Sequence, residues 1–263
     1  MVPTHTPLDA LPLWGVFVFT LVLVLAAVEI GYLGGRRRHR RVTGEKEGPV
    51  GAMVGSTIGL LALMLGFTFS FAANRFDVRR TVLIDETNAI GTTYLRADML
   101  PEPHRTEIRS LLRGYTDMRL EGAKTQDLAG VLKHSDEIQQ KLWAHAVALG
   151  RESPNSIVVG LFIQTLNETI DIHAKRLMIV TRTRIPTPIW SVLYLVAFIS
   201  LLGLGYQSAI SETSRSPAVF MIAIAFSLVI CLVADMDRPQ EGAIKLSQQS
   251  MVDLQTMMHA DKD

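Results

Sequence analysis

Cysteine is almost absent from this chain of 263 residues, which contains only Cys231. A single cysteine cannot form a disulfide within one chain, and no cluster of cysteine and histidine has the spacing of a metal site. The chain also lacks a zinc-protease HExxH motif, a phosphate-binding glycine loop, a dinucleotide fingerprint and a GxSxG nucleophile motif. We therefore expect no enzyme, no bound metal and no cofactor.

Excess charge of one sign is lacking as well. The formal net charge is +1, 19% of the residues are charged and 48% are hydrophobic. This balance excludes a disordered chain and a polybasic protein that binds nucleic acid. No Lys or Arg precedes the first apolar segment, so we do not expect a cleaved signal peptide there. The composition is that of a membrane protein.

What the chain does have is four long apolar segments. Each is long enough to cross a hydrocarbon layer of roughly 30 Å as a helix: residues 11–33, 51–74, 189–207 and 218–234. The sequence between the second and third segments shows the apolar periodicity of water-soluble amphipathic helices. We predict an all-α integral membrane protein with a helical soluble domain between its second and third membrane helices. The predicted parts are 1–74, the first membrane helix pair; 75–185, the soluble domain; 186–236, the second pair; and 237–263, a C-terminal tail.

No strong helix breaker follows the second segment until Pro101, so a single helix should extend well beyond the membrane. Residues 104–121 and 125–149 each predict one further helix of the soluble domain. Another helix should start at Ser153 and Pro154, where a hydroxyl cap precedes a proline.

Residues 51–74 separate into three faces when they are projected at 100° per residue. One face is a seam of small residues that another helix could approach closely: Gly55, Gly59, Ala62 and Gly66, continued by Ser70 and Ala73. A second, bulky face suits lipid: Val54, Ile58, Leu61, Leu65 and Phe69. Between them runs an apolar stripe with a polar residue at each end: Ser56, Leu60, Leu63, Phe67, Phe71 and Asn74.

Charge near the membrane gives a weak indication of orientation. The basic loop after the first segment, set against an N-terminus without Lys or Arg, favours that loop in the cytoplasm and the soluble domain outside. The domain's own junctions with the membrane are also basic, so the two sides of the membrane differ little in basic charge. Asp235, Asp237 and Glu241 follow the fourth segment without the spacing of a calcium loop, and we interpret them as a solvated exit from the membrane.

The run LALMLGFTFSFAANRFDVRRTVLIDETNAIGTTYLRADML, with LNETIDIHAKRL further on, resembles the bestrophin-like family of bacterial membrane proteins. The resemblance implies a pentameric anion channel whose second membrane helix lines the pore. It also implies a neck of three bulky apolar residues spaced four apart, here Leu63, Phe67 and Phe71. Such a ring gates ions by dewetting. In bestrophins the domain between the second and third spans is cytoplasmic, whereas the charges near the membrane in this sequence favour a domain outside. The calcium clasp of animal bestrophins has no evident counterpart here.

We therefore expect a homo-oligomeric ion channel of the bacterial inner membrane, a multi-pass protein whose partners are its own copies, lipid and a permeant inorganic ion. The remaining pore-lining candidates are Ser56, Leu60, Ser70 and Asn74. Asp85, Glu86 and Asn88 are candidates for a vestibule, where paired carboxylates would attract cations. Anion selectivity rests on the family analogy alone.

Alternatives stay open at each point. The three apolar neck residues could instead pack against a neighbouring span, and Asp85 and Glu86 could be an ordinary charge pair on a soluble helix. The whole protein could be a non-conducting membrane-anchored scaffold or sensor whose helical domain binds a partner.

Overall fold

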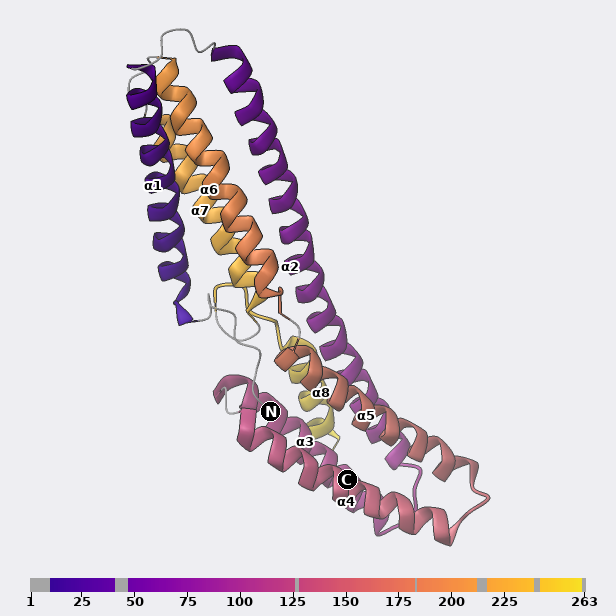
Figure 1. Ribbon diagram of the computed structural model, residues 1–263. Coiled ribbons are helices and arrows are strands. Elements are labelled where there is room, and N and C mark those ends of the chain that lie inside the picture. Colours follow the sequence, from indigo (N-terminus) through magenta and orange to yellow (C-terminus); the bar gives the residue numbers. More distant parts are fainter. Residues whose placement is uncertain are drawn as a thin grey trace. The chain divides into compact units, whose positions relative to one another are not determined.

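The computed structural model describes residues 10–40, 47–125, 128–182, 184–211, 217–238 and 242–261, and every regular element in these ranges is a helix (Figure 1). The helices are α1 Leu13–His39, α2 Glu47–Ala97, α3 His104–Thr125, α4 Leu128–Glu152, α5 Ile157–Arg182, α6 Thr187–Ile210, α7 Ala218–Asp237 and α8 Gln249–Ala260. The predicted all-α fold is confirmed.

Four of these helices, α1, α2, α6 and α7, are long and apolar enough to cross a membrane. They contain the four predicted apolar segments. Helix α1 extends to His39, beyond the predicted end at residue 33, and its last turn holds Arg36, Arg37 and Arg38. Cations are favourable there because the C-terminal end of a helix carries partial negative charge.

The chain forms two compact units, each built from separate stretches of sequence. Unit 1 comprises residues 1–76 and 183–245, and unit 2 comprises residues 77–182 and 246–263. Helix α2 contributes its apolar first half to unit 1 and its polar second half to unit 2. The C-terminal residues, which we assigned to a tail of their own, are divided between the two units, and α8 belongs to unit 2.

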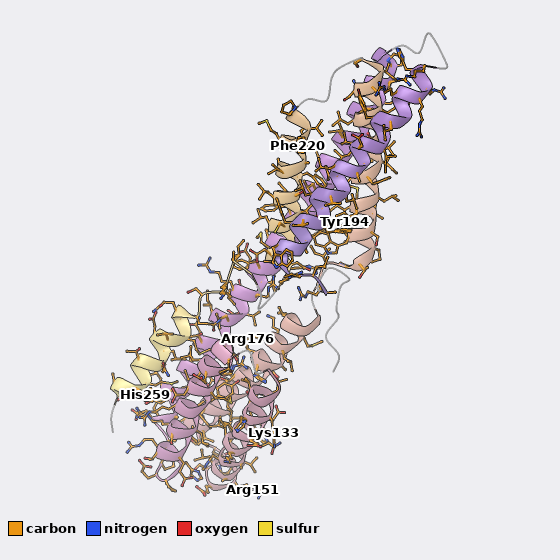
Figure 2. All side chains as sticks on the ribbon, turned by 90° about the vertical axis from the view of Figure 1, so that its left-hand side faces the viewer. Lys133, Arg151, Arg176, Tyr194, Phe220 and His259 are labelled. Atoms are coloured by element: carbon orange, nitrogen blue, oxygen red, sulfur yellow. The ribbon has the colours of Figure 1, made fainter. Side chains whose placement is uncertain are left out.

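Helix α1 of unit 1 packs against α6 and α7 (Figure 1). The approach to α6 is very close because glycines remove the side chains at the contact. A Cβ atom at Gly31 would lie 1.9 Å from the carbonyl oxygen of Leu202, and one at Gly205 would lie 2.0 Å from that of Val28. The hydroxyl of Tyr194, labelled in Figure 2, lies 2.9 Å from Thr20 Oγ1 and adds a polar contact to this apolar interface.

Unit 2 is held together by a core drawn from α2, α3, α4, α5 and α8. Its largest fully buried side chains include Tyr94, Tyr115 and Phe162. Met251, Leu254 and Met258 bring the apolar face of α8 into the same core. The residues that we assigned to a C-terminal tail thus include an amphipathic helix.

Helix α5 begins at Ile157, three residues later than the Pro154 signal predicts. The cap is Ser156, whose Oγ accepts a hydrogen bond of 3.3 Å from the backbone N–H of Val159. Both Ser153 and Ser156 can cap a helix, so composition did not decide between them.

We expect Gly31→Ala to destabilise unit 1, because the new methyl group would overlap the backbone of α6. Overpacking of this kind costs about 1–3 kcal/mol. The matched control is Gly34→Ala in the same helix, where a Cβ meets nothing within 4 Å. Thermal melting of the detergent-solubilised variants, followed by size-exclusion chromatography, checks this. Equal melting temperatures for the wild type and Gly31→Ala would contradict the close contact.

Candidate functional site

One face of α2 in unit 1 is left uncovered by the rest of the chain. Leu60, Leu63, Phe67 and Phe71 are 51%, 56%, 59% and 51% exposed, which is far outside the range of packed apolar side chains. The polar ends of the stripe, Ser56 and Asn74, are exposed too, as is the other pore-lining candidate, Ser70. The described part of the chain thus leaves more than half of each apolar side chain uncovered, which argues against close packing of the neck residues on another span of the same chain.

The small-residue seam beside this stripe is uncovered as well. Gly55, Gly59, Ala62 and Gly66 are exposed, and a Cβ atom at any of the three glycines would meet nothing within 4 Å. The chain thus does not use the seam for its own packing, unlike the glycines that α1 and α6 place at their contact.

Most of the bulky face that we assigned to lipid is instead buried or partly buried against other helices, although Phe69 is 40% exposed. Val54 and Leu61 are 6% exposed, and Leu61 and Leu65 belong to a core that also contains Trp190 and Leu193 of α6. Ser200 Oγ of α6 donates a hydrogen bond of 3.1 Å to the carbonyl of Thr57. The assignment was wrong because lipid and a neighbouring helix are equally apolar, so hydropathy does not distinguish them.

In unit 2, α2 and α5 form an open groove of about 780 Å³. Helix α2 lines it with Asp85, Asn88, Ala89 and Thr92, and α5 lines it with Gln164, Asn167, Glu168, Asp171, Ile172 and Lys175. The two helices are joined next to it by a hydrogen bond of 3.0 Å between the hydroxyls of Thr93 and Thr169. The charged lining consists of three carboxylates and one ammonium group, so the groove is acidic.

The α5 side of this groove was missed from the sequence. From the sequence we assigned no role to Gln164, Asn167, Glu168 and Asp171, and all four are exposed. Their spacing of three and four residues, continued by Lys175, does mark one helical face. That signal was present and was not used.

Glu86, a predicted vestibule residue, is fully buried at 0% exposed and does not line the groove. Its carboxylate pairs with Arg119 of α3 at 2.9 Å and with Arg176 of α5, which is labelled in Figure 2. Asp85 and Asn88 do lie at the groove, so the adjacent residues Asp85 and Glu86 of α2 differ in their surroundings. The reason is the helical period: Glu86 is turned about 100° from Asp85 and faces the core.

The two arginines keep Glu86 ionised. Burial alone would raise its pKa, but the nearby guanidinium groups of Arg176 and Arg119 outweigh burial and lower it. Burial also raises the pKa of Tyr115 well above its usual value, and the Tyr115 hydroxyl lies 3.0 Å from His173 Nδ1. The carboxylate therefore joins α2, α3 and α5 through charged contacts inside unit 2.

Asp235 and Asp237, in the last turn of α7, are buried rather than solvated, so for these two residues that expectation was wrong. Asp235 accepts hydrogen bonds from the backbone N–H groups of Ala243 and Ile244, at 3.1 and 3.2 Å. Asp237 accepts one of 3.0 Å from the N–H of Ile185. Glu241 lies outside the described residues. Both aspartates thus hold chain segments of unit 1 together, a role that sequence spacing does not reveal.

We expect Glu86→Gln to destabilise unit 2 by about 3–5 kcal/mol, because two buried guanidinium groups lose their counter-charge. The pKa of Glu86 is lowered in the fold, so its contribution is fully present above its ordinary value of 4.5 and is lost as the pH falls below it. Thermal unfolding followed by circular dichroism, from pH 7 to well below 4.5, measures both effects. Asp85→Asn, in the groove, is the control and should stay within about 0.5 kcal/mol of wild type. A Glu86→Gln protein as stable as Asp85→Asn would contradict the buried pair.

Comparison with known proteins agrees with this architecture. Solved structures similar to the chain include a bacterial bestrophin homologue from Klebsiella pneumoniae, with 16% identity and a TM-score of 0.67 over 94% of this chain and 99% of that one. A single-residue variant of a bacterial bestrophin homologue from the same organism gives a TM-score of 0.69 at 16% identity, covering 92% and 97% of the two chains. At such identities the likeness shows the fold.

The sequence comparisons give the family. No curated protein matches the chain in sequence. The family model for the Bestrophin-like domain matches residues 18–251. Because that range is most of the sequence, the chain belongs to the Bestrophin-like family.

Proposed function

We propose that the protein is a homo-oligomeric ion channel of the bacterial inner membrane and that α2 lines its pore. The observation that carries the proposal is the uncovered stripe of α2, in which four large apolar side chains are each more than half exposed. A membrane anchor has no need of a helix face that differs from its other faces and is left unpartnered.

A ring of chains gives each face of α2 a partner. The buried face holds α2 to its own unit, the glycine seam lets a neighbouring copy approach closely, and the stripe faces the axis. Family resemblance makes five the expected number of copies. The interface needs no cofactor, since small residues and apolar contacts are sufficient.

The gate in this proposal is the run of Leu63, Phe67 and Phe71. These residues follow one another at four-residue spacing, so they form successive apolar rings when several copies surround an axis. A narrow hydrocarbon ring excludes ions because it replaces none of the water that they lose.

The α2 residues of the groove have the same helical register as the stripe. Asp85 and Thr92 lie eighteen residues beyond Phe67 and Asn74, which is about five full turns at 3.6 residues per turn. Residues separated by whole turns share a face of a helix. We therefore place the acidic groove along the ion pathway, as the wall of a vestibule.

Charge at this wall favours cations. Asp85, Glu168 and Asp171 face a single Lys175 in the groove, and a cleft lined mainly by one sign concentrates ions of the other sign. This inference opposes the anion selectivity that the family analogy implies, and it comes from side chains of this chain.

We expect Phe67→Ala to raise single-channel conductance or open probability, because it removes the bulk of the middle ring. Recording the purified protein in a planar bilayer under a KCl gradient measures this. Phe69→Ala is the matched control, since Phe69 lies on another face of the same helix and should leave the current unchanged.

If neither the wild type nor Phe67→Ala carries a current, although the oligomer is shown to be intact, the proposal of a channel is overturned. A membrane-anchored scaffold would then be the better explanation, and its helical domain would be the place to look for a partner.

We expect Glu168→Gln with Asp171→Asn to shift the reversal potential in that gradient towards the chloride equilibrium potential. The change leaves the groove with one carboxylate and one ammonium group, so it no longer favours cations. Glu137→Gln, which neutralises an exposed carboxylate of α4 outside the groove, is the control. An unchanged reversal potential in the double variant would remove the groove from the ion pathway while leaving the gate on α2 untouched.

A further inference from the structure

Two histidines that are far apart in sequence meet head to head in unit 2. His104 is the first residue of α3, and His145 lies near the end of α4. Their Nδ1 atoms are 3.0 Å apart, and the two rings are nearly perpendicular. The side chains are mostly buried, 14% and 19% exposed.

Each ring turns its other nitrogen towards a carboxylate. His145 Nε2 lies 3.3 Å from Glu107, and His104 Nε2 lies 3.7 Å from Glu152. The order along the contact is therefore carboxylate, imidazole, imidazole, carboxylate. Ring nitrogens that face a carboxylate are best protonated, because a lone pair there would be repelled.

Two neutral imidazoles offer two N–H groups for the three contacts, so one contact is left without a proton. Each neutral ring carries one N–H. If both protons face the carboxylates, two lone pairs meet at the centre, and if one proton lies at the centre, one lone pair faces a carboxylate. A positive charge at the centre resolves the conflict, because both Nδ1 lone pairs can then bind it.

Spacing and surroundings suit a transition-metal ion at that position. Zinc binds imidazole nitrogen at about 2.0–2.1 Å, so two such bonds at angles between 90° and tetrahedral separate the nitrogens by about 2.9–3.4 Å. Metal-ligating histidines usually donate their second N–H to a carboxylate, as Glu107 and Glu152 allow here. We propose that His104 and His145 bind a divalent ion of the zinc, nickel or copper class.

Water must complete the coordination. No group of three or more His, Cys, Asp or Glu side chains in the described ranges could hold a metal, so the protein supplies two ligands. An open groove of about 420 Å³ reaches His145 and gives water access. Glu107 and Lys141 also line this groove and nearly cancel in charge. The ion is thus exchangeable and fastens the start of α3 to the end of α4.

The test is isothermal titration of ZnCl2 into the full-length protein, purified without a histidine tag and stripped with EDTA. Wild type should bind one Zn²⁺ per chain that His104→Gln and His145→Gln each lose. Glu107→Gln keeps both ligands and should weaken binding by about 10–100-fold, less than either histidine change. His134→Gln is the matched control, because His134 is exposed on the same helix α4 and bonds the Gly130 carbonyl of its own helix.

Circular dichroism of each metal-free variant checks that it is folded. The proposal is overturned if the wild type binds no zinc, because the central charge is then only a shared proton. It is also overturned if folded His104→Gln and His145→Gln bind zinc as tightly as His134→Gln does.

Discussion

Helix α2 must bury one face in each unit while its opposite face stays bare, and this constraint shapes the rest of the molecule. In unit 1 the buried face packs on α6 through Leu61 and Leu65, and in unit 2 it supplies Tyr94 to the core. The bare face includes Phe67 in unit 1, and in unit 2 the helix turns Asp85 to the groove. Each unit thus leaves part of this helix of 51 residues accessible.

Charged contacts, and not apolar packing alone, hold the α2 side of the groove in unit 2 in place. Glu86 stands one position after Asp85, so its contacts with Arg119 and Arg176 fix the helix rotation that turns Asp85 to the groove. A buried ion pair is costly to desolvate and is poor evidence for extra stability. It is well suited to setting the rotation of a helix, because a one-residue slip would leave the arginines unpaired.

The sequence was enough for the helices and their order, because apolar runs, amphipathic periods and prolines are local signals. It also predicted the three faces of residues 51–74. It did not predict which of them is buried, since the environment of Leu61 depends on α6, which lies more than a hundred residues away. The same limit explains Glu86, Asp237 and His145, whose partners are brought near only by the fold. Polar residues in helical sequence look solvated until their counterparts are known.

The placement of α8 has a consequence for how the protein is made. Its residues Met251 and Leu254 complete a core whose other members end with α5, and all of α6 and α7 lies between them in the sequence. Domains normally fold as units while the chain is still being synthesised. Here unit 2 stays open on the ribosome until both later membrane helices have been produced. Helix α8, which follows both of them in the sequence, closes it.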